Sequence, residues 1–258
     1  MKYVSAGRDF SIKKIKNKNM YKKYRKLNPK IDNKNWQILF TTQFQNMQKL
    51  NAIATFWING FSKLGIDNSR RPSIKEINKI SAKYTGYRYV QTKMNVIMSK
   101  IGWYEMVARY EMPVTNFVRK PSELDYCDEP DSFHEIMGHI AMYIDKEYSD
   151  MIQTLAKLYI DAYYAKREDL LKEIDFINDY VIELGLIREP SGIKAFGATL
   201  YSSGEVKEAF KKKNQRVLGN KIPNEKKGYD RSKPQGRYYI IESIDQINKL
   251  LVQIRNRF

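Results

Sequence analysis

The sequence has little that would suit disulfide bonding, secretion or membrane insertion. Among its 258 residues there is one cysteine, Cys127, so no disulfide can form within the chain. Such usage favours a reducing compartment, and we expect a cytoplasmic protein. The basic N-terminus lacks a following apolar run of signal-peptide length, and no stretch approaches the about 18 uninterrupted apolar residues of a membrane helix. We therefore expect neither a secretion signal nor a membrane span.

Acidic residues are scarce in two parts of the chain. Lys and Arg number 46 against 29 Asp and Glu, which gives a net charge of +17. Residues 13–30 contain no acid and residues 207–228 are rich in Lys, whereas residues 121–189 are rich in acids. A basic excess attracts nucleic acid or an acidic partner, and it is equally compatible with a solvated coat around a neutral or acidic site. A nucleic-acid-binding protein is therefore an alternative, although no zinc finger or similar module is recognisable.

The apolar residues predict a folded and mainly helical chain. They make up 42% of the sequence and aromatics 13%, far more than disordered chains contain. Apolar residues recur at helical spacing over residues 36–64, 146–165 and 167–184, and a final amphipathic helix ends near Arg255. Short strand candidates are residues 89–98, 114–118 and 238–241. We predict a mainly α fold with a few short β-strands and hairpins, preceded by a basic N-terminal arm over residues 1–35.

Several local signals mark where the predicted elements begin and end. Ser73 followed by Glu76 resembles a capping box, and Asp131 is a good N-cap for a helix that starts at Ser132. Gly65 and Gly185 are plausible helix stops. Residues 190–192 (Pro-Ser-Gly) predict a turn between two short strands.

The chain has only two histidines, His134 and His139, and both lie within six residues. On an ideal α-helix a gap of five residues turns through about 500°, so the two rings would diverge by about 140°. They can meet at one ion only if the helix distorts or ends, which Gly138 permits. The zinc protease pattern instead places two histidines four residues apart, so the spacing argues against that class.

A metal held by two histidines needs at least one further protein ligand. Neutral imidazole suits iron, copper, nickel and zinc, and a carboxylate would complete the two-histidine, one-carboxylate face of non-haem Fe(II) oxygenases. Glu183 is the strongest candidate because its neighbours in residues 181–186 are apolar or glycine, and a buried carboxylate needs a partner. The other candidates are Glu135, Asp145, Glu147 and Glu173.

Four ordered blocks resemble one enzyme family. The segment EPDSFHEIMGH (residues 129–139) resembles the signature of the tetrahydropterin-dependent aromatic amino acid hydroxylases. PVTNFVR (residues 113–119) is similar to the strand and arginine that precede it in bacterial phenylalanine hydroxylases. IELGL (residues 182–186) resembles the segment with the family's iron-binding glutamate, and IKAFGATLYSSGE (residues 193–205) its hairpin. The resemblance covers about half of the chain and implies that residues 36–258 form a single catalytic domain of this type.

The resemblance also implies the cofactors and the metal ligands. His134, His139 and Glu183 would hold Fe(II), and a tetrahydropterin and O2 would be cosubstrates. Glu135 would be a catalytic residue that faces the pterin, and Trp103 would lie beside the pterin ring. The implied activity is hydroxylation of an aromatic amino acid ring, with L-phenylalanine to L-tyrosine as the default and tryptophan, tyrosine or another aromatic as alternatives.

Three further positions would bind the amino acid substrate. Arg119 would pair with the substrate carboxylate, which a guanidinium can contact at two points. Asp131 would orient Arg119, and Ser202 would lie near the substrate carboxylate and the first histidine.

The chain departs from the family pattern around the substrate pocket. The family's tryptophan-containing wall before the iron glutamate is replaced by Asn178, Asp179 and Tyr180, and the aromatic that follows the glutamate is Leu184. Cys127 and Asp128 replace a threonine and a proline, and one residue is missing between Ser203 and Gly204. These departures leave open the identity of the substrate, and they also allow a relative that keeps the fold only as a binding module. A hydrolase with zinc at the same ligands is a separate alternative.

Overall fold

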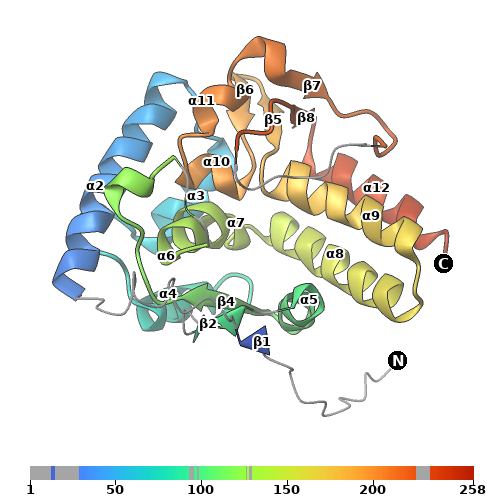
Figure 1. The fold of residues 1–258 in the computed structure, drawn as a ribbon, viewed down its shortest axis with the longest axis horizontal. Coiled ribbons are helices and arrows are strands. Elements are labelled where there is room, and N and C mark those ends of the chain that lie inside the picture. The colour runs from blue at the N-terminus through green and yellow to red at the C-terminus, as the bar shows by residue number, and fades with distance from the viewer. Residues whose placement is uncertain are drawn as a thin grey trace.

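The computed structural model describes residues 13–14, 29–92, 96–97, 99–125, 127, 130–224 and 233–258, and within them helices dominate (Figure 1). The α-helices are α2 (Pro29–Lys49), α3 (Thr55–Leu64), α4 (Ile74–Ser81), α5 (Lys100–Ala108), α6 (Ser132–His134), α7 (Ala141–Tyr143), α8 (Lys146–Tyr164), α9 (Glu168–Phe176), α10 (Ala198–Ser202), α11 (Val206–Ala209) and α12 (Ile244–Arg255). Two π-helical segments (Glu135–Ile140 and Ile177–Ile182) and two 3-10 turns (Pro121–Glu123 and Lys212–Asn214) connect them. The predicted mainly α fold is confirmed.

The strands are short and form three small sheets. They are β1 (Lys13–Lys14), β2 (Arg88–Thr92), β3 (Val96–Ile97), β4 (Glu111–Thr115), β5 (Leu186–Glu189), β6 (Gly192–Ala195), β7 (Gln215–Val217) and β8 (Tyr238–Ile241). The largest sheet has the order β6-β5-β8-β7, in which β5 and β6 are antiparallel and the other pairs are parallel. β2 pairs in parallel with β4, and β1 antiparallel with β3. The hairpin predicted around residues 190–192 is confirmed, and its Gly192 has a φ of 112° that favours glycine.

Helix α8 is the centre of a helical layer that also contains α5, α9 and α12. It begins at Asp145, whose side chain accepts a hydrogen bond from the Tyr148 N–H. Its buried residues recur at three- and four-residue spacing: Tyr148, Met151, Ile152, Leu155, Ala156, Leu158, Tyr159 and Ala162. In Figure 1 this layer lies opposite α2, with α6, α7 and α10 between them.

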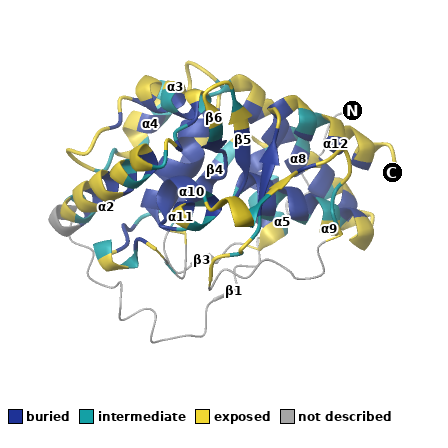
Figure 2. Cartoon of the chain, turned by 90° about the horizontal axis from the view of Figure 1, so that it is seen from above, coloured by how far each residue is buried: buried dark blue, intermediate teal, exposed yellow. Residues whose placement is uncertain are grey.

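The middle of the molecule is buried (Figure 2), and one tryptophan links three of its elements. The Trp57 ring on α3 stacks on Tyr201 of α10 at 4.5 Å between ring centroids, and its Nε1 donates to the Met137 carbonyl at 2.8 Å. Since Met137 belongs to the first π-helical segment, this side chain holds α3, α10 and that segment together.

The helical run predicted over residues 36–64 is two helices. The break lies at Asn51, which has a φ of 52°, a conformation that asparagine tolerates better than most residues. The buried Lys194 ammonium donates to the Asn51 carbonyl and side-chain oxygens at 2.9 and 2.7 Å. A cation at the C-terminal end of α2 is favourable for the helix dipole, so Lys194 of β6 stabilises this end of the helix.

The strand predicted over residues 114–118 lies earlier, at Glu111–Thr115. Residues 116–118 are not in a strand because the Phe117 carbonyl accepts hydrogen bonds from Ser132 N–H and Oγ, at 2.8 and 2.5 Å. The signals at Ser73, Asp131 and Gly65, and the elements β8 and α12, are confirmed.

Two other expectations concern the N-terminal arm and a possible membrane span. Helix α2 begins at Pro29, inside the predicted arm of residues 1–35, and the division at residue 35 stays a prediction. No helix of the described residues has the length and apolarity that a membrane span needs.

A partly buried carboxyl, Glu205, joins α11 to the sheet. Its Oε1 accepts hydrogen bonds from the Tyr238 hydroxyl at 2.9 Å and from the Gln235 N–H at 3.2 Å. Burial raises the pKa of the Glu205 carboxyl. The folded state therefore holds this proton more tightly than the unfolded chain, so ionisation of Glu205 lowers stability as the pH rises above the usual carboxyl range.

Glu205→Gln keeps a hydrogen-bond acceptor and removes the titrating group. Relative to wild type, we expect its free energy of unfolding to increase between about pH 4.5 and about pH 7.5, as measured by urea unfolding at both pH values. Glu208→Gln is the control, because a hydrogen bond from Lys211 lowers the pKa of that carboxyl, and it should show no such increase. A pH-independent difference for Glu205→Gln would contradict the prediction.

Candidate metal and substrate site

The histidine segment folds as a π-helix. Asp131 caps the N-terminus of α6 by accepting a hydrogen bond from the His134 N–H at 3.0 Å, and residues 135–140 then form the first π-helical segment. Its hydrogen bonds join residues five apart, so side chains at that spacing lie on one face. The distortion that the spacing of His134 and His139 required is therefore present.

Gly138 has a packing role in this segment. A Cβ at this position would lie 2.6 Å from the carbonyl oxygen of Ala198 and 2.9 Å from its Cβ. Only glycine lets α10 approach this closely, so the residue positions α10 beside the two histidines.

Glu183 follows a second π-helical segment, which extends α9. The apolar stripe predicted for this helix (Leu170, Ile174, Ile177, Val181 and Leu184) is fully buried. The Glu183 N–H donates to the Asn178 carbonyl at 2.9 Å, a bond across five residues. The chain then turns at Gly185 into β5, so the carboxylate leaves the helix end in the direction of the histidines.

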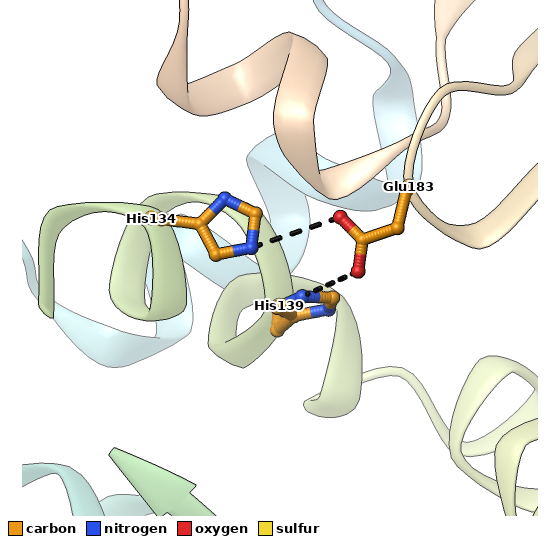
Figure 3. Close-up of side chains that lie close together, drawn as sticks. All are labelled: His134, His139 and Glu183. Atoms are coloured by element: carbon orange, nitrogen blue, oxygen red, sulfur yellow. Dashed lines mark ion pairs between the residues drawn. The ribbon is translucent and has the colours of Figure 1, made fainter. Parts of the chain in front are cut away.

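The three side chains converge (Figure 3). The Nε2 atom of His139 lies 3.2 Å from Oε1 of Glu183, and Nε2 of His134 lies 3.7 Å from Oε2. One ligand atom from each residue lies within 4.8 Å of the others. The donors are two imidazoles and one carboxylate, from helices far apart in sequence, and this set suits Fe(II).

Burial and neighbouring charges shift the pKa values of the three side chains in different directions. Burial lowers the pKa of His134 to about 4, so this imidazole is neutral near pH 7. Burial alone would also lower the pKa of His139, but the Glu183 carboxylate beside it raises that pKa above its usual value. Burial alone would raise the pKa of Glu183, whereas the two imidazoles and Thr199 hold it well below its usual range. The site therefore contains a carboxylate that requires a neighbouring positive charge.

Ser202 fixes the ring of His134. Its Oγ lies 2.8 Å from Nδ1 of His134 and 3.1 Å from the Ala198 carbonyl, to which the hydroxyl donates. The serine oxygen then accepts the Nδ1–H of His134 and leaves Nε2 unprotonated toward Glu183. Such outer contacts commonly orient metal-binding histidines.

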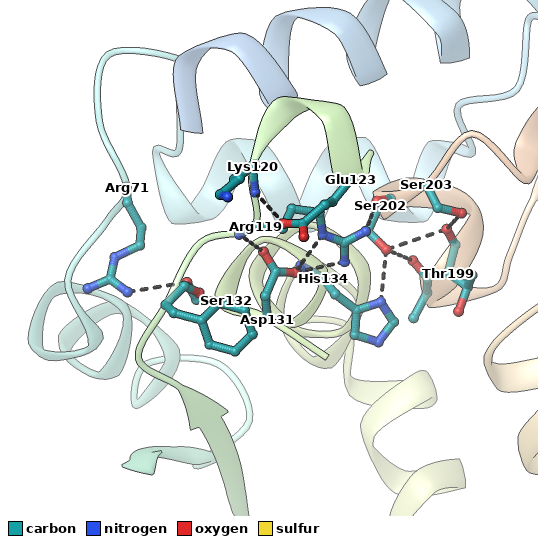
Figure 4. A network of polar contacts seen from close by, with 12 residues as sticks. Arg71, Arg119, Lys120, Glu123, Asp131, Ser132, His134, Thr199, Ser202 and Ser203 are labelled. Carbon is teal, nitrogen blue, oxygen red and sulfur yellow. Dashed lines mark hydrogen bonds and ion pairs between the residues drawn. The ribbon is translucent and has the colours of Figure 1, made fainter. Parts of the chain in front are cut away.

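Arg119 and Asp131 form a buried ion pair beside the candidate metal ligand His134 (Figure 4). Arg119 Nε and Nη2 donate to Oδ1 of Asp131 at 2.9 and 2.7 Å, and its main-chain N–H donates to Oδ2 at 2.6 Å. Nη1 of Arg119 donates to the Ser202 carbonyl at 3.2 Å. The structure thus brings together all three residues predicted to bind the substrate.

The two residues predicted to contact the pterin differ in their surroundings. Glu135 is buried, its Oε2 has no hydrogen-bond partner among the described residues, and burial raises its pKa to about 8. Trp103 on α5 is partly buried and its ring lies 5.0 Å from that of Tyr104. No described contact joins Trp103 to His134, His139 or Glu183.

The other candidate carboxylates have different roles. Asp145 caps α8, and Glu173 pairs with Arg257 at 2.6 Å on the surface. Glu147 lies in the first turn of α8, where an acid is favourable for the helix dipole. Among the described residues, His134, His139 and Glu183 form the metal-type cluster.

Four of the positions that depart from the family pattern, Asn178, Asp179, Tyr180 and Leu184, lie on and just after the second π-helical segment. Leu184 is fully buried, and the Tyr180 ring stacks on Phe176 at 5.2 Å. Asn178 donates to the Asp179 carboxylate at 3.0 Å. Burial raises the pKa of Asp179, Lys100 lowers it, and Glu183 adds to the increase. Asp179 is therefore close enough to Glu183 for the two carboxylates to repel each other. Asp128 lies outside the described residues.

Sequence reasoning did not identify Thr199 as part of the site. Its Oγ1 donates to Oε2 of Glu183 at 2.8 Å, and its N–H donates to the Glu183 carbonyl at 2.9 Å. The only sequence signal was a polar residue three positions before Ser202, which alone indicates no role.

Comparison with known proteins finds one family that matches almost the whole chain. The family described as biopterin-dependent aromatic amino acid hydroxylase matches residues 13–258. Curated relatives include phenylalanine-4-hydroxylases from Pseudomonas aeruginosa, 29% identical over 68% of this chain and 64% of that protein, and from Ralstonia nicotianae, 27% identical over 84% and 67%. The chain thus spans about two thirds of the length of these relatives.

Solved structures show the same fold. Phenylalanine hydroxylase from Legionella pneumophila has a TM-score of 0.76 at 22% identity and covers 90% of this chain and 91% of its own. The enzyme from Chromobacterium violaceum bound to cobalt has a TM-score of 0.74 at 24% identity and covers 88% and 83%. The expected fold of an aromatic amino acid hydroxylase catalytic domain is confirmed.

Separate replacement of His134, His139 and Glu183 by alanine tests whether these three residues bind the metal. We expect each variant to lose stoichiometric Fe(II), because two remaining side chains give too few ligands for a stable site. Metal analysis after anaerobic loading and desalting measures the bound iron. Glu173→Ala, a surface carboxylate paired with Arg257, is the control and should retain iron. Full iron retention in all three variants would show that these residues are not the ligands.

Proposed function

Because the chain belongs to the biopterin-dependent aromatic amino acid hydroxylase family, we propose that it is an iron- and pterin-dependent monooxygenase that hydroxylates the ring of an aromatic amino acid. The default reaction is L-phenylalanine to L-tyrosine. The observation that carries the proposal is the convergence of His134, His139 and Glu183 on one point in the interior. Two imidazoles and a carboxylate leave part of an iron coordination sphere open for reactants.

His134, His139 and Glu183 would hold the Fe(II). When bound, the iron and a tetrahydropterin would together supply the O2 chemistry, which a protein side chain cannot provide. The chain has to orient the substrate ring, exclude water and keep the ligands in place. Ser202, which fixes His134, serves the last of these tasks.

Arg119 would bind the carboxylate of the amino acid. Three of the five guanidinium N–H groups are used by the hydrogen bonds to Asp131 and Ser202. Two N–H groups are left for a two-point contact with a substrate carboxylate. A substrate fixed at this end would present its ring at a constant distance from the metal, and such orientation is a large source of rate enhancement.

Glu135 would contact the pterin from inside the site. Its Oε2 is buried without a hydrogen-bond partner among the described residues, and an orphaned polar atom of this kind is expected where a ligand binds. Trp103 would lie beside the pterin ring, which the family resemblance supports.

The residues that replace the family's tryptophan-containing wall support tryptophan, tyrosine or another aromatic amino acid as alternative substrates. Asn178 and Asp179 give it an acidic and hydrogen-bonding character where the family has a tryptophan. A ring with its own hydrogen-bond donor would suit such a wall. A cytoplasmic location stays a proposal that rests on the single cysteine. Binding of nucleic acid or an acidic partner rests on net charge alone and is the weaker candidate.

Product analysis tests the reaction class. Protein loaded with Fe(II) under anaerobic conditions, then given tetrahydropterin, O2 and L-phenylalanine, is expected to yield tyrosine, seen as the gain of one oxygen atom by mass spectrometry. Tryptophan and tyrosine in parallel reactions identify the preferred substrate, and Zn-loaded protein is the control. If no aromatic amino acid gains oxygen while iron is bound, the proposed activity is wrong.

Arg119→Lys tests the substrate-binding role while it keeps a positive charge beside Asp131. Loss of a charge-assisted two-point contact worth about 1.5–3 kcal/mol should raise KM for the amino acid by roughly 10- to 150-fold. Iron content should be unchanged. Steady-state kinetics and metal analysis check both, with the surface variant Arg216→Ala as control. An unchanged KM would exclude Arg119 from substrate binding.

A further inference from the structure

Thr199 contacts Glu183 through both its main chain and its side chain. Its N–H donates to the Glu183 carbonyl at 2.9 Å, and its Oγ1 donates to the Oε2 carboxylate oxygen at 2.8 Å. We propose that Thr199 is a positioning residue, whose hydroxyl fixes the orientation of the Glu183 carboxylate for metal binding. The inference rests on the proposed function, because it assigns a role toward the iron that Glu183 would hold.

A glutamate carboxylate does not fix its own orientation. The terminal torsion of glutamate is broad and roughly two-fold, so its oxygens rotate freely unless an external group holds one of them. In this site Oε1 faces Nε2 of His139 at 3.2 Å and Oε2 faces Nε2 of His134 at 3.7 Å. The Thr199 hydroxyl occupies one lone pair of Oε2 and resists rotation of the group. Glu183 thereby keeps one carboxylate oxygen directed at each imidazole.

The support under Thr199 is rigid enough for this role. Nε2 of Gln43, a fully buried side chain on α2, donates to the carbonyls of Leu200 and Ser203 at 2.8 and 2.9 Å. At Gly197 a Cβ would lie 2.3 Å from the main chain of Glu183. The N-terminal end of α10 and the main chain of Glu183 are therefore in direct contact, and a shift of α10 would move the Thr199 hydroxyl and Glu183 together.

Helix α10 orients two of the three ligands. Thr199 holds Glu183, and Ser202, one turn further along, contacts Nδ1 of His134 at 2.8 Å. The third ligand, His139, has no hydrogen-bond partner for its Nδ1 among the described residues. A threonine hydroxyl in a helix commonly bonds to a main-chain carbonyl of the preceding turn; in Thr199 it is directed at the carboxylate instead. This choice of partner indicates a role at the site.

Three variants separate the hydroxyl from the rest of the side chain. Thr199→Val keeps the shape and removes the hydroxyl, and Thr199→Ala does so without the branched methyl groups. Thr199→Ser restores the hydroxyl. Thr154→Val is the matched control, because the Thr154 hydroxyl bonds to the Asp150 carbonyl on the exposed part of α8.

Co(II) is the probe, titrated into metal-free protein without pterin or amino acid. We expect Thr199→Val and Thr199→Ala to bind Co(II) about 10- to 100-fold more weakly than wild type, as typical for loss of an outer contact to a metal ligand. The visible absorption spectrum of any bound Co(II) should change, because the carboxylate changes its orientation. Thr199→Ser should restore both properties, and Thr154→Val should match wild type.

The outcomes distinguish this inference from the proposed function. Wild-type affinity and spectrum in both Thr199→Val and Thr199→Ala would overturn the role of the hydroxyl. Equal weakening in Thr199→Ser would also overturn it, because the effect would then follow side-chain packing. If wild-type protein itself bound no Co(II), the proposed metal site would fail first. Thermal melting of each metal-free variant identifies any variant that does not fold. If either Thr199→Val or Thr199→Ala fails to fold, the Co(II) affinity and spectrum of the other one test the role of the hydroxyl.

Discussion

The convergence of two imidazoles and one carboxylate inside the protein is the arrangement on which the other features depend. His134 and His139 are five residues apart, so they share a face only because their helix is locally a π-helix. Glu183 reaches them from a second π-helical segment and an immediate turn into β5. The close backbone approach of α10, which requires Gly138 and Gly197, places further polar groups around the same point.

Buried charges around this point are connected to one another. Asp131 binds the guanidinium of Arg119 and also caps the helix that begins just before His134. A buried ion pair is costly unless its remaining hydrogen bonds are satisfied, and here the main chain and Ser202 satisfy several of them. The proposed substrate-binding arginine and the proposed metal ligands therefore share one rigid framework. A displacement of Asp131 would disturb both.

The basic surface and the site are separate features of the chain. Lys and Arg outnumber acids six to one over residues 207–221, whereas the region around Glu183 contains the carboxyls of Glu135 and Asp179. The net charge of +17 comes largely from residues 1–28 and 207–228, which do not include the residues of the site. Asn178 and Asp179 lie on the second π-helical segment and are not among the three candidate ligands, so their departure from the family pattern leaves the ligand set unchanged.

The sequence by itself determined the helical character, the helix caps at Ser73 and Asp131, the β5–β6 hairpin, and the residues that meet at the site, because these depend on local spacing and on ordered motifs. Tertiary structure alone decided the rest. The break at Asn51 is stabilised by Lys194, more than 140 residues away, and Phe117, which follows β4, bonds to Ser132 instead of to a strand. Thr199 acquired its contact with Glu183 only when α10 packed beside the π-helical segments. Contacts between residues distant in sequence leave no periodic signal, so they become visible only when the chain is folded.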